Sequence, residues 1–303
     1  MDIIQILKDE LQINRSQAEA AVKLIDEGNT IPFIARYRKE ATGSLNDEVL
    51  RNLDERLKYL RNLEERKEQV INSIREQEKL TPELEKKILA ASTLVAVEDL
   101  YLPYRQKRKT RASIAKEKGL EPLANLVLMQ LTKTPLLKEA EHYISEEKGV
   151  LTAEEALNGA KDILAERIAE TAEYRTYIRK ATFQEGSLDS SARDGNAESV
   201  YEMYYNFTEP VKKAAGHRIL ALNRGEKEKI LTVKITAPEE KILRYLEKKV
   251  ITRKNPETAR VLREVTEDSY KRLISPAIER EIRSELTENA EAGAIKVFGK
   301  NLE

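Results

Sequence analysis

The residues best suited to chemistry in this sequence form a cluster of cations between positions 105 and 118. One acid, Glu117, lies within this stretch, and two tyrosines, Tyr101 and Tyr104, precede it. The basic residues are Arg105, Lys107, Arg108, Lys109, Arg111, Lys116 and Lys118. Clustered cations displace the counterions of a phosphate backbone, and tyrosine rings stack on bases. The stretch therefore predicts a nucleic-acid contact; the alternative is a solvated loop between helices, with both tyrosines in the core.

Two further basic stretches are candidates. Arg36, Arg38 and Lys39 surround Tyr37, and they either join the first cluster in space or form a structural loop held against a long helix. Residues 241–254 carry six cations and one acid. They lie between two predicted helices, as a helix-turn-helix element requires. A helical surface whose C-terminal lysines interact favourably with the helix dipole is the preferred interpretation of this last stretch.

Side chains for catalysis or metal binding are scarce. The chain has two histidines, His142 and His217, and no cysteine, so a thiolate metal site is excluded and a histidine site is not expected. The glycine spacings that cradle phosphates in nucleotide-binding loops are absent. Adjacent carboxylates such as Glu154 and Glu155 point in different directions on a helix and cannot share a proton. We therefore expect no enzymatic activity, no cofactor and no metal.

The composition favours a helical, cytoplasmic protein. Of 303 residues, 35% are charged, whereas Gly (11) and Pro (9) are few. Glu, Lys, Arg and Leu lose little rotamer freedom in a helix, and too few turn residues remain for an all-β fold. No signal peptide and no apolar run of about 18 residues is present, so no contact with a membrane is expected. Because 53 cations balance 53 acids, any nucleic-acid contact must be local.

Helical periodicity accounts for most of the chain, and it predicts a mainly α, elongated assembly of many helices. Leucines three and four residues apart indicate a long helix over 47–77, and a capping pattern opens a second one over about 152–180. The alternating, β-branched residues 230–235 predict the one short strand.

The domain organisation follows from one turn-rich segment. Residues 184–195 are small and polar, so they predict a hinge or linker between a helical domain, 1–183, and a second helical region, 196–303. A helix over 196–205 is expected to open the second region. The helical pattern of residues 278–290 is unfinished where the sequence stops, which is typical of a piece of a longer protein.

Four segments, in this order and spacing, resemble the Tex family of bacterial transcription accessory proteins. They are residues 30–43 (TIPFIARYRKEATG), 99–123 (DLYLPYRQKRKTRASIAKEKGLEPL), 217–225 (HRILALNRG) and 275–286 (SPAIEREIRSEL). The resemblance implies a helical N-terminal region with a helix-turn-helix-like element. It also implies a nuclease-like YqgF domain, helix-hairpin-helix motifs and an OB-fold RNA-binding domain. We expect these later modules to lie beyond this sequence, which would remove the family's principal RNA-binding module.

The resemblance and the basic stretches together predict a non-enzymatic scaffold. Its expected partners are RNA or DNA, bound through the basic patches, and RNA polymerase or other transcription machinery. The alternative is a purely structural helical module that binds only protein partners. Salt dependence of RNA binding distinguishes the two, because phosphate contacts weaken as salt rises.

Overall fold

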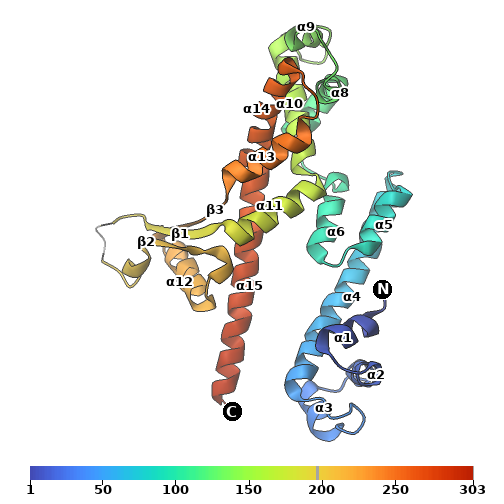
Figure 1. Cartoon of the computed structure of the whole chain (residues 1–303), viewed down its shortest axis with the longest axis vertical. Coiled ribbons are helices and arrows are strands. Elements are labelled where there is room, and N and C mark those ends of the chain that lie inside the picture. Colours follow the sequence, from blue (N-terminus) through green and yellow to red (C-terminus); the bar gives the residue numbers. More distant parts are fainter. Residues whose placement is uncertain (196–197, 303) are drawn as a thin grey trace. The chain divides into compact units, whose positions relative to one another are not determined.

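The computed structural model describes residues 1–195 and 198–302, and it divides the chain into two compact units, 1–104 and 105–303 (Figure 1). Most of both units is helical, which confirms the mainly α prediction. Each unit has its own core of buried aliphatic side chains. The units are therefore described one at a time.

Unit 1 is organised by its longest helix. Helix α4, Asp47–Glu76, begins where the Asn46 side chain accepts a hydrogen bond from the Val49 amide (2.9 Å), and its buried stripe runs from Leu50 to Ile74. One core packs the first helices on the N-terminal half of α4, and another packs the later ones on its C-terminal half. The others are α1 Ile3–Leu11, α2 Arg15–Asp26, α3 Ile31–Tyr37, α5 Pro82–Ala90, α6 Leu94–Tyr101 and a 3-10 turn, Leu102–Tyr104.

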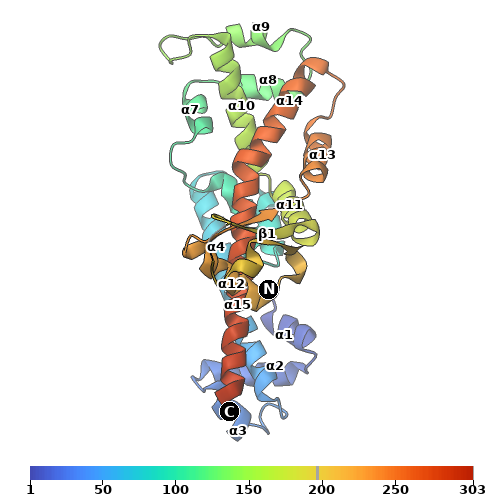
Figure 2. The same ribbon diagram turned by 90° about the vertical axis from the view of Figure 1, so that its left-hand side faces the viewer.

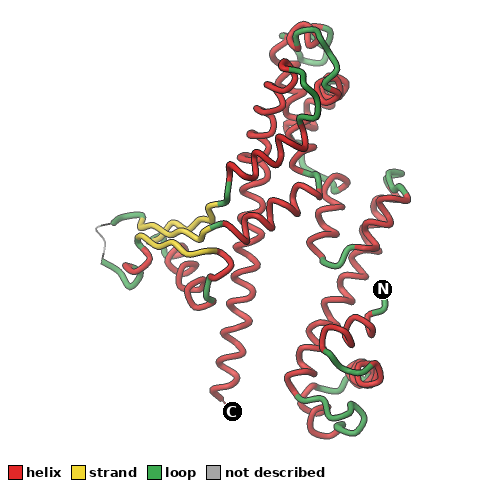
Figure 3. The backbone as a smooth tube through the Cα atoms, in the orientation of Figure 1, coloured by secondary structure: helices red, strands yellow, loops and turns green. Residues whose placement is uncertain are grey.

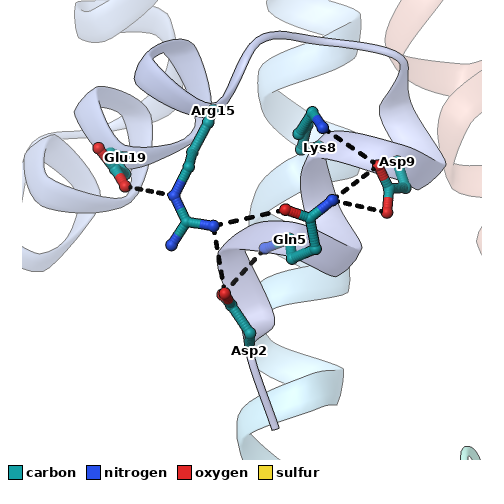
Figure 4. A network of polar contacts seen from close by, with 6 residues as sticks. All are labelled: Asp2, Gln5, Lys8, Asp9, Arg15 and Glu19. Atoms are coloured by element: carbon teal, nitrogen blue, oxygen red, sulfur yellow. Dashed lines mark hydrogen bonds and ion pairs between the residues drawn. The ribbon is translucent and has the colours of Figure 1, made fainter.

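Polar contacts fix the angle between α1 and α2. Figure 4 shows the Arg15 guanidinium donating to Asp2 at the start of α1 (3.1 Å) and to Glu19 one turn along α2 (2.9 Å). Asp2 also accepts from the Gln5 amide, and that bond, followed by the contact with Arg15, holds the pKa of Asp2 below its usual value. These exposed pairs set geometry more than they add stability.

Unit 2 is built around a long helical rod. Helix α14, Pro256–Asp268, continues through a π-helical turn, Ser269–Ile274, into α15, Ser275–Leu302, and Figure 2 shows the three as one rod. Helix α10, Ala153–Ala169, packs against α14 and the π-turn. The other helices are α7 Arg111–Glu117, α8 Glu121–Met129, α9 Leu136–Glu141, α11 Ala172–Glu185, α12 Gly216–Lys227 and α13 Glu239–Val250, with 3-10 turns at Glu202–Tyr204 and Val211–Lys213.

A small antiparallel sheet lies in unit 2, in the order β2-β1-β3 (Figure 3). Strand β3, Leu231–Thr236, confirms the strand predicted at 230–235, because its buried residues alternate with exposed ones. Strands β1, Ser187–Ala192, and β2, Asn206–Pro210, were not predicted. In β1, Asp189 lies opposite Thr208 of β2 and Lys234 of β3.

The structure differs from the predicted linker at 184–195. Strand β1 lies inside this segment and is the central strand of the sheet, so the segment is part of a folded unit. Its small polar residues have low strand propensity, and they adopt the strand because neighbours pair with both edges. Leu188 is buried on the inner face, and the buried Ser190 hydroxyl donates to the Tyr204 carbonyl (2.6 Å).

Two other boundaries also differ from the predictions. Along the chain, the boundary between the two units falls between Tyr104 and Arg105, far from the predicted boundary at residue 184. The helix predicted over 152–180 is two helices, α10 and α11, because the backbone of Thr171 is extended (φ −73°, ψ 113°) and interrupts the helical path. Of the helix predicted over 196–205, residues 196–197 lie outside the described residues, and the rest contains only the short 3-10 turn.

Candidate nucleic-acid interface

The first cation cluster is engaged by acids of its own unit. The Lys107 ammonium donates to Glu166 of α10 (2.9 Å) and to Glu170, which lies one turn later, directly after the last residue of that helix. Thr110, which caps α7, donates its hydroxyl to the other oxygen of Glu166 (2.9 Å). Partial burial opposes a charge on Lys107, but the two carboxylates raise its pKa above the usual value. Lys107 therefore ties the segment before α7 to α10, and this role keeps it from a ligand.

Burial and charge affect the two acids of this site in opposite directions. Partial burial opposes ionisation of Glu166, but bonds from Lys107 and Thr110 hold its pKa below the usual value. Burial raises the pKa of Glu170, and the neighbouring Glu166 charge adds to that effect, so the lysine offsets only part of it. The arrangement is a half-buried structural ion triad.

Other members of the cluster are partly neutralised as well. Lys109 lies 3.5 Å from Glu117, and the Lys118 ammonium donates to the Gly149 carbonyl (3.0 Å). Arg111 lies within electrostatic range of Asp162, whose pKa is raised by burial against the opposing charges of Arg272 and Arg111. The remaining cations of the cluster are exposed and form no ion pair with any residue that the structure describes. They are Arg105, Arg108 and Lys116.

The two tyrosines before the cluster pack in unit 1. Both rest against the core on the C-terminal half of α4. The Tyr101 hydroxyl hydrogen-bonds with Ser73 (3.0 Å), and the Arg66 guanidinium lies over its ring, 5.3 Å from the centroid. The Tyr104 carbonyl accepts from the Gln77 amide (2.9 Å). This is the core-packing alternative, so these rings are not placed to stack on bases.

The segment that ends α3 combines exposed cations with an exposed aromatic ring. Tyr37 is 61% exposed, and its ring lies 5.3 Å from that of Phe33 one turn earlier. The Arg38 guanidinium lies 5.2 Å over the Phe33 ring. Arg36 and Lys39 are exposed and form no ion pair with a residue in the described ranges. Unpaired cations beside an exposed ring are the features that single-stranded nucleic-acid sites use.

The turn after this segment is held by hydrogen bonds. The buried Thr42 hydroxyl donates to the Arg38 carbonyl (3.2 Å), and the Ser44 amide donates to the Lys39 carbonyl (2.7 Å). The side chain of Gln17 on α2 donates to the Gly43 carbonyl (3.0 Å). The turn is thus fixed in part from α2, and α3 itself packs against the long helix α4, as the structural alternative predicted. Arg36 and Lys39 remain exposed beside it.

The third basic stretch separates into two parts. Lys241 pairs with Glu185, and Lys249 pairs with Glu173 (2.5 Å). Arg253 and Lys254 instead line a pocket of about 540 Å³ between α13 and α14. Arg263, about one turn further along α14 than Ala259, completes this pocket and was missed from the sequence. The helix-turn-helix character of the region stays a prediction.

The two histidines considered for catalysis or metal binding do not lie in the same element. His142, which follows α9, and His217, in α12, are both exposed. Within residues 1–195 and 198–302, no three His, Asp or Glu side chains are grouped so that they could hold a metal ion. Among the same residues, no helix has the length and apolar character needed to span a bilayer.

Comparison with known proteins identifies the family. The model of the Tex central region-like domain matches residues 132–298, and that of the Tex-like N-terminal domain matches residues 1–75. Over 98% of its length the chain is 49% identical to protein YdcI of Bacillus subtilis, and it covers 42% of that protein.

Relatives named for transcription or RNA binding also match over nearly the whole chain. The chain is 40% identical, over all of its length, to the transcriptional accessory protein Tex of Neisseria gonorrhoeae, of which it covers 40%. It is 31% identical, over 99% of its length, to the human S1 RNA-binding domain-containing protein 1, of which it covers 32%. The chain thus spans about two fifths or less of each relative. Since one family model alone matches more than half of the sequence, the chain belongs to the Tex family, as its sequence motifs predicted.

Proposed function

We propose that this chain is a non-enzymatic scaffold of a Tex-type transcription accessory factor, and that it contacts single-stranded nucleic acid through residues 33–39. The observation that carries the proposal is the exposed Tyr37 ring between two unpaired cations, Arg36 and Lys39. A base can stack on the ring while the cations neutralise the phosphates on either side. The fixed turn supports this, because little order has to be gained on binding.

The first cation cluster has a smaller part in this proposal than the sequence suggested. Arg105, Arg108 and Lys116 remain available to phosphates, whereas Lys107 holds α10. The names of the relatives support a role in transcription and RNA binding, and we propose RNA polymerase or another part of the transcription machinery as the protein partner. The place of action that we propose is the cytoplasm.

A purely structural module that binds only protein is the second candidate. The acids near Lys107, Lys109 and Arg111 favour this candidate, because they neutralise much of the positive charge that the sequence predicted for the first cluster. The two candidates differ in what the exposed cations do. Only the first requires that reversing the charge of Arg36 and Lys39 weaken the binding of RNA.

Fluorescence anisotropy of a labelled oligouridylate, measured across a range of KCl concentrations, tests the proposal. Single strands give a slope of log affinity against log salt of about −0.7 for each neutralised phosphate, so Arg36→Glu with Lys39→Glu should make the slope shallower by about 1.4. Lys86→Glu with Lys87→Glu is the matched control, because these exposed lysines on α5 have no ion pair among the described residues. Tyr37→Ala should weaken binding by about 1–3 kcal/mol, and Tyr37→Phe should preserve it.

The outcomes separate the two candidates. Loss of binding in the Arg36 and Lys39 variant, with the control unchanged, supports the scaffold that contacts nucleic acid. No binding of the oligouridylate by the parent chain at low salt, or equal losses in both charge variants, favours the protein-only module. Cleavage of the oligouridylate in the presence of magnesium would contradict the non-enzymatic part of the proposal.

A further inference from the structure

The geometry of the turn between α13 and α14 points to a second binding site, a pocket for the phosphates of a nucleic-acid backbone. The pocket has a volume of about 540 Å³ and is lined by the turn, residues 251–255, and by the first two turns of α14. Its cations are Arg253, Lys254 and Arg263. It lies in unit 2 and is distinct from residues 33–39 in unit 1, although its assignment to nucleic acid rests on the proposed function.

A buried glutamine holds the turn in place. Gln130, which ends α8, is 4% exposed, and its side-chain oxygen accepts from the amides of Thr252 (3.1 Å) and Arg253 (3.2 Å). Its side-chain nitrogen donates to the Val250 carbonyl (2.9 Å). Asn255 returns the contact, donating to the carbonyls of Gln130 (3.3 Å) and Thr132 (2.7 Å). The turn is therefore ordered before any ligand arrives, which reduces the entropy lost on binding.

The positive charge of the pocket is largely uncompensated. Arg253 and Lys254 are exposed and have no ion pair in the part of the chain that the structure describes. Arg263 has one acid near it, Glu247, at the long distance of 4.0 Å. The other acid at this end of α14, Glu257, accepts the Leu136 amide (3.0 Å) and faces α9.

The positive charge of the pocket comes from its side chains, and the N-terminus of α14 adds little to it. Asn255 caps the helix by accepting the Thr258 amide (3.4 Å), and Pro256 has no amide hydrogen to donate. A ligand must therefore be held by the guanidinium and ammonium groups. The proposal stands on these three side chains and the hollow that they line.

The shape of the pocket favours phosphate over the carboxylates of an acidic peptide. Its volume is within the range that proteins use for small ligands, so a phosphate with part of its sugar fits inside. Two guanidinium forks match the oxygens of a phosphate, which carries more acceptors than one carboxylate. A single Glu or Asp side chain would occupy only a fraction of the hollow. An acidic peptide is accordingly the competing occupant in the test.

Inorganic tripolyphosphate is the first probe, because it reports on the pocket independently of residues 33–39. Calorimetric titration at low salt should show saturable binding by the parent chain, lost in Arg253→Glu with Lys254→Glu. Lys212→Glu with Lys213→Glu is the matched control, since it reverses two adjacent exposed lysines of the same unit. Absence of saturable binding by the parent chain, or equal loss in the control, overturns the inference whatever the result for residues 33–39.

Labelled oligouridylate is the second probe, and it links the pocket to nucleic acid. Reversal of Arg253 and Lys254 should make the salt slope shallower by about 1.4, because two phosphate contacts are lost. If the Arg36 and Lys39 variant weakens binding and this variant does not, the proposed function survives and the pocket inference is overturned. Oligoglutamate binding that depends on Arg253 and Lys254, without any effect on RNA, would assign the pocket to an acidic peptide and also overturn it.

A third variant tests whether Gln130 acts as a positioning residue. Gln130→Leu keeps all three cations but removes the bonds that order the turn. RNA affinity should fall by about tenfold, which corresponds to about 1.4 kcal/mol. The salt slope should be unchanged, because the number of phosphate contacts is the same. An unchanged affinity, with the fold verified by circular dichroism, would overturn the positioning role.

Discussion

Replacement of Gly186 by alanine tests whether the segment between α11 and β1 is a folded junction or a flexible linker. Gly186 lies between α11 and β1, within the segment 184–195 that the sequence suggested was a linker. A Cβ atom there would lie 2.3 Å from the Thr182 carbonyl oxygen and 3.0 Å from that of Thr236. Both oxygens belong to the backbone, so neither can move aside by a change of rotamer. The helix or the strand has to shift.

The cost of Gly186→Ala can be assembled from two contributions. The Gly186 amide donates to the same Thr182 oxygen (2.9 Å), and separating the two loses about 1 kcal/mol of hydrogen bonding. Overpacking at a fixed site costs about 1–3 kcal/mol more. The sum is about 2–4 kcal/mol, and each kcal/mol lowers the melting temperature of a unit of this size by about 2–4 °C. We therefore expect a fall of roughly 5–15 °C.

Thermal unfolding followed by circular dichroism measures this fall, with Gly195→Ala as the matched control. Gly195 lies in the same segment, and a Cβ there would meet nothing within 4 Å. The control should change stability by less than about 0.5 kcal/mol. In a flexible linker, both substitutions would be neutral or slightly stabilising, by about 0.4–1 kcal/mol. Equal melting temperatures for the two variants would therefore refute the folded junction.

Three other perturbations test single features of unit 2. Lys107→Met leaves the half-buried acids of α10 without their cation, so urea denaturation should show a loss of about 1–3 kcal/mol, whereas Lys116→Met should show almost none. Partial burial opposes the charge of Asp189, but hydroxyls of Thr236, Thr208 and Ser187 hold its pKa below 3.8. The ionised Asp189 side chain therefore contributes fully to the stability of the fold above pH 3.8, and this contribution is lost as pH falls through the lowered pKa. Acid titration of Asp189→Asn should accordingly lack the part of the stability loss seen in the parent chain below pH 3.8. Gly293→Ala, in an open stretch of α15, should raise the melting temperature because it stabilises the helix by about 0.5–1 kcal/mol, and a decrease would show hidden contacts.

The parts of the fold that the sequence predicts are those whose pattern is local. The stripe of α4 repeats every three or four residues, and the Asn46 cap lies beside it, so both can be seen within one window. Strand β3 alternates buried and exposed residues, which is a pattern of six neighbours. Strand β1 has one large apolar side chain, Leu188, and its structure depends on partners well away from it in the sequence. No window of the sequence contains that information.

The candidate site shows the same division. Arg36 and Lys39 were predicted as contact residues, and their side chains remain available because the bonds that hold the turn use backbone groups and the Thr42 hydroxyl. The pocket at the α13–α14 turn is completed by Arg263, which lies on α14 beyond the basic stretch. Its turn is held by Gln130, which is more than a hundred residues earlier in the sequence. Only the folded chain brings these together.

Lys107 shows why a cluster of cations in a sequence overstates the charge that a surface offers. Glu166 and Glu170 are one turn apart at the C-terminal end of α10, and like charges at that spacing destabilise a helix, more so when they are half-buried. The lysine relieves this repulsion from a position about sixty residues earlier in the chain. It therefore stabilises the end of α10, whatever the chain binds. Arg36, Lys39, Arg253 and Lys254 meet no such need, and charges that folding does not use are the ones left for a ligand.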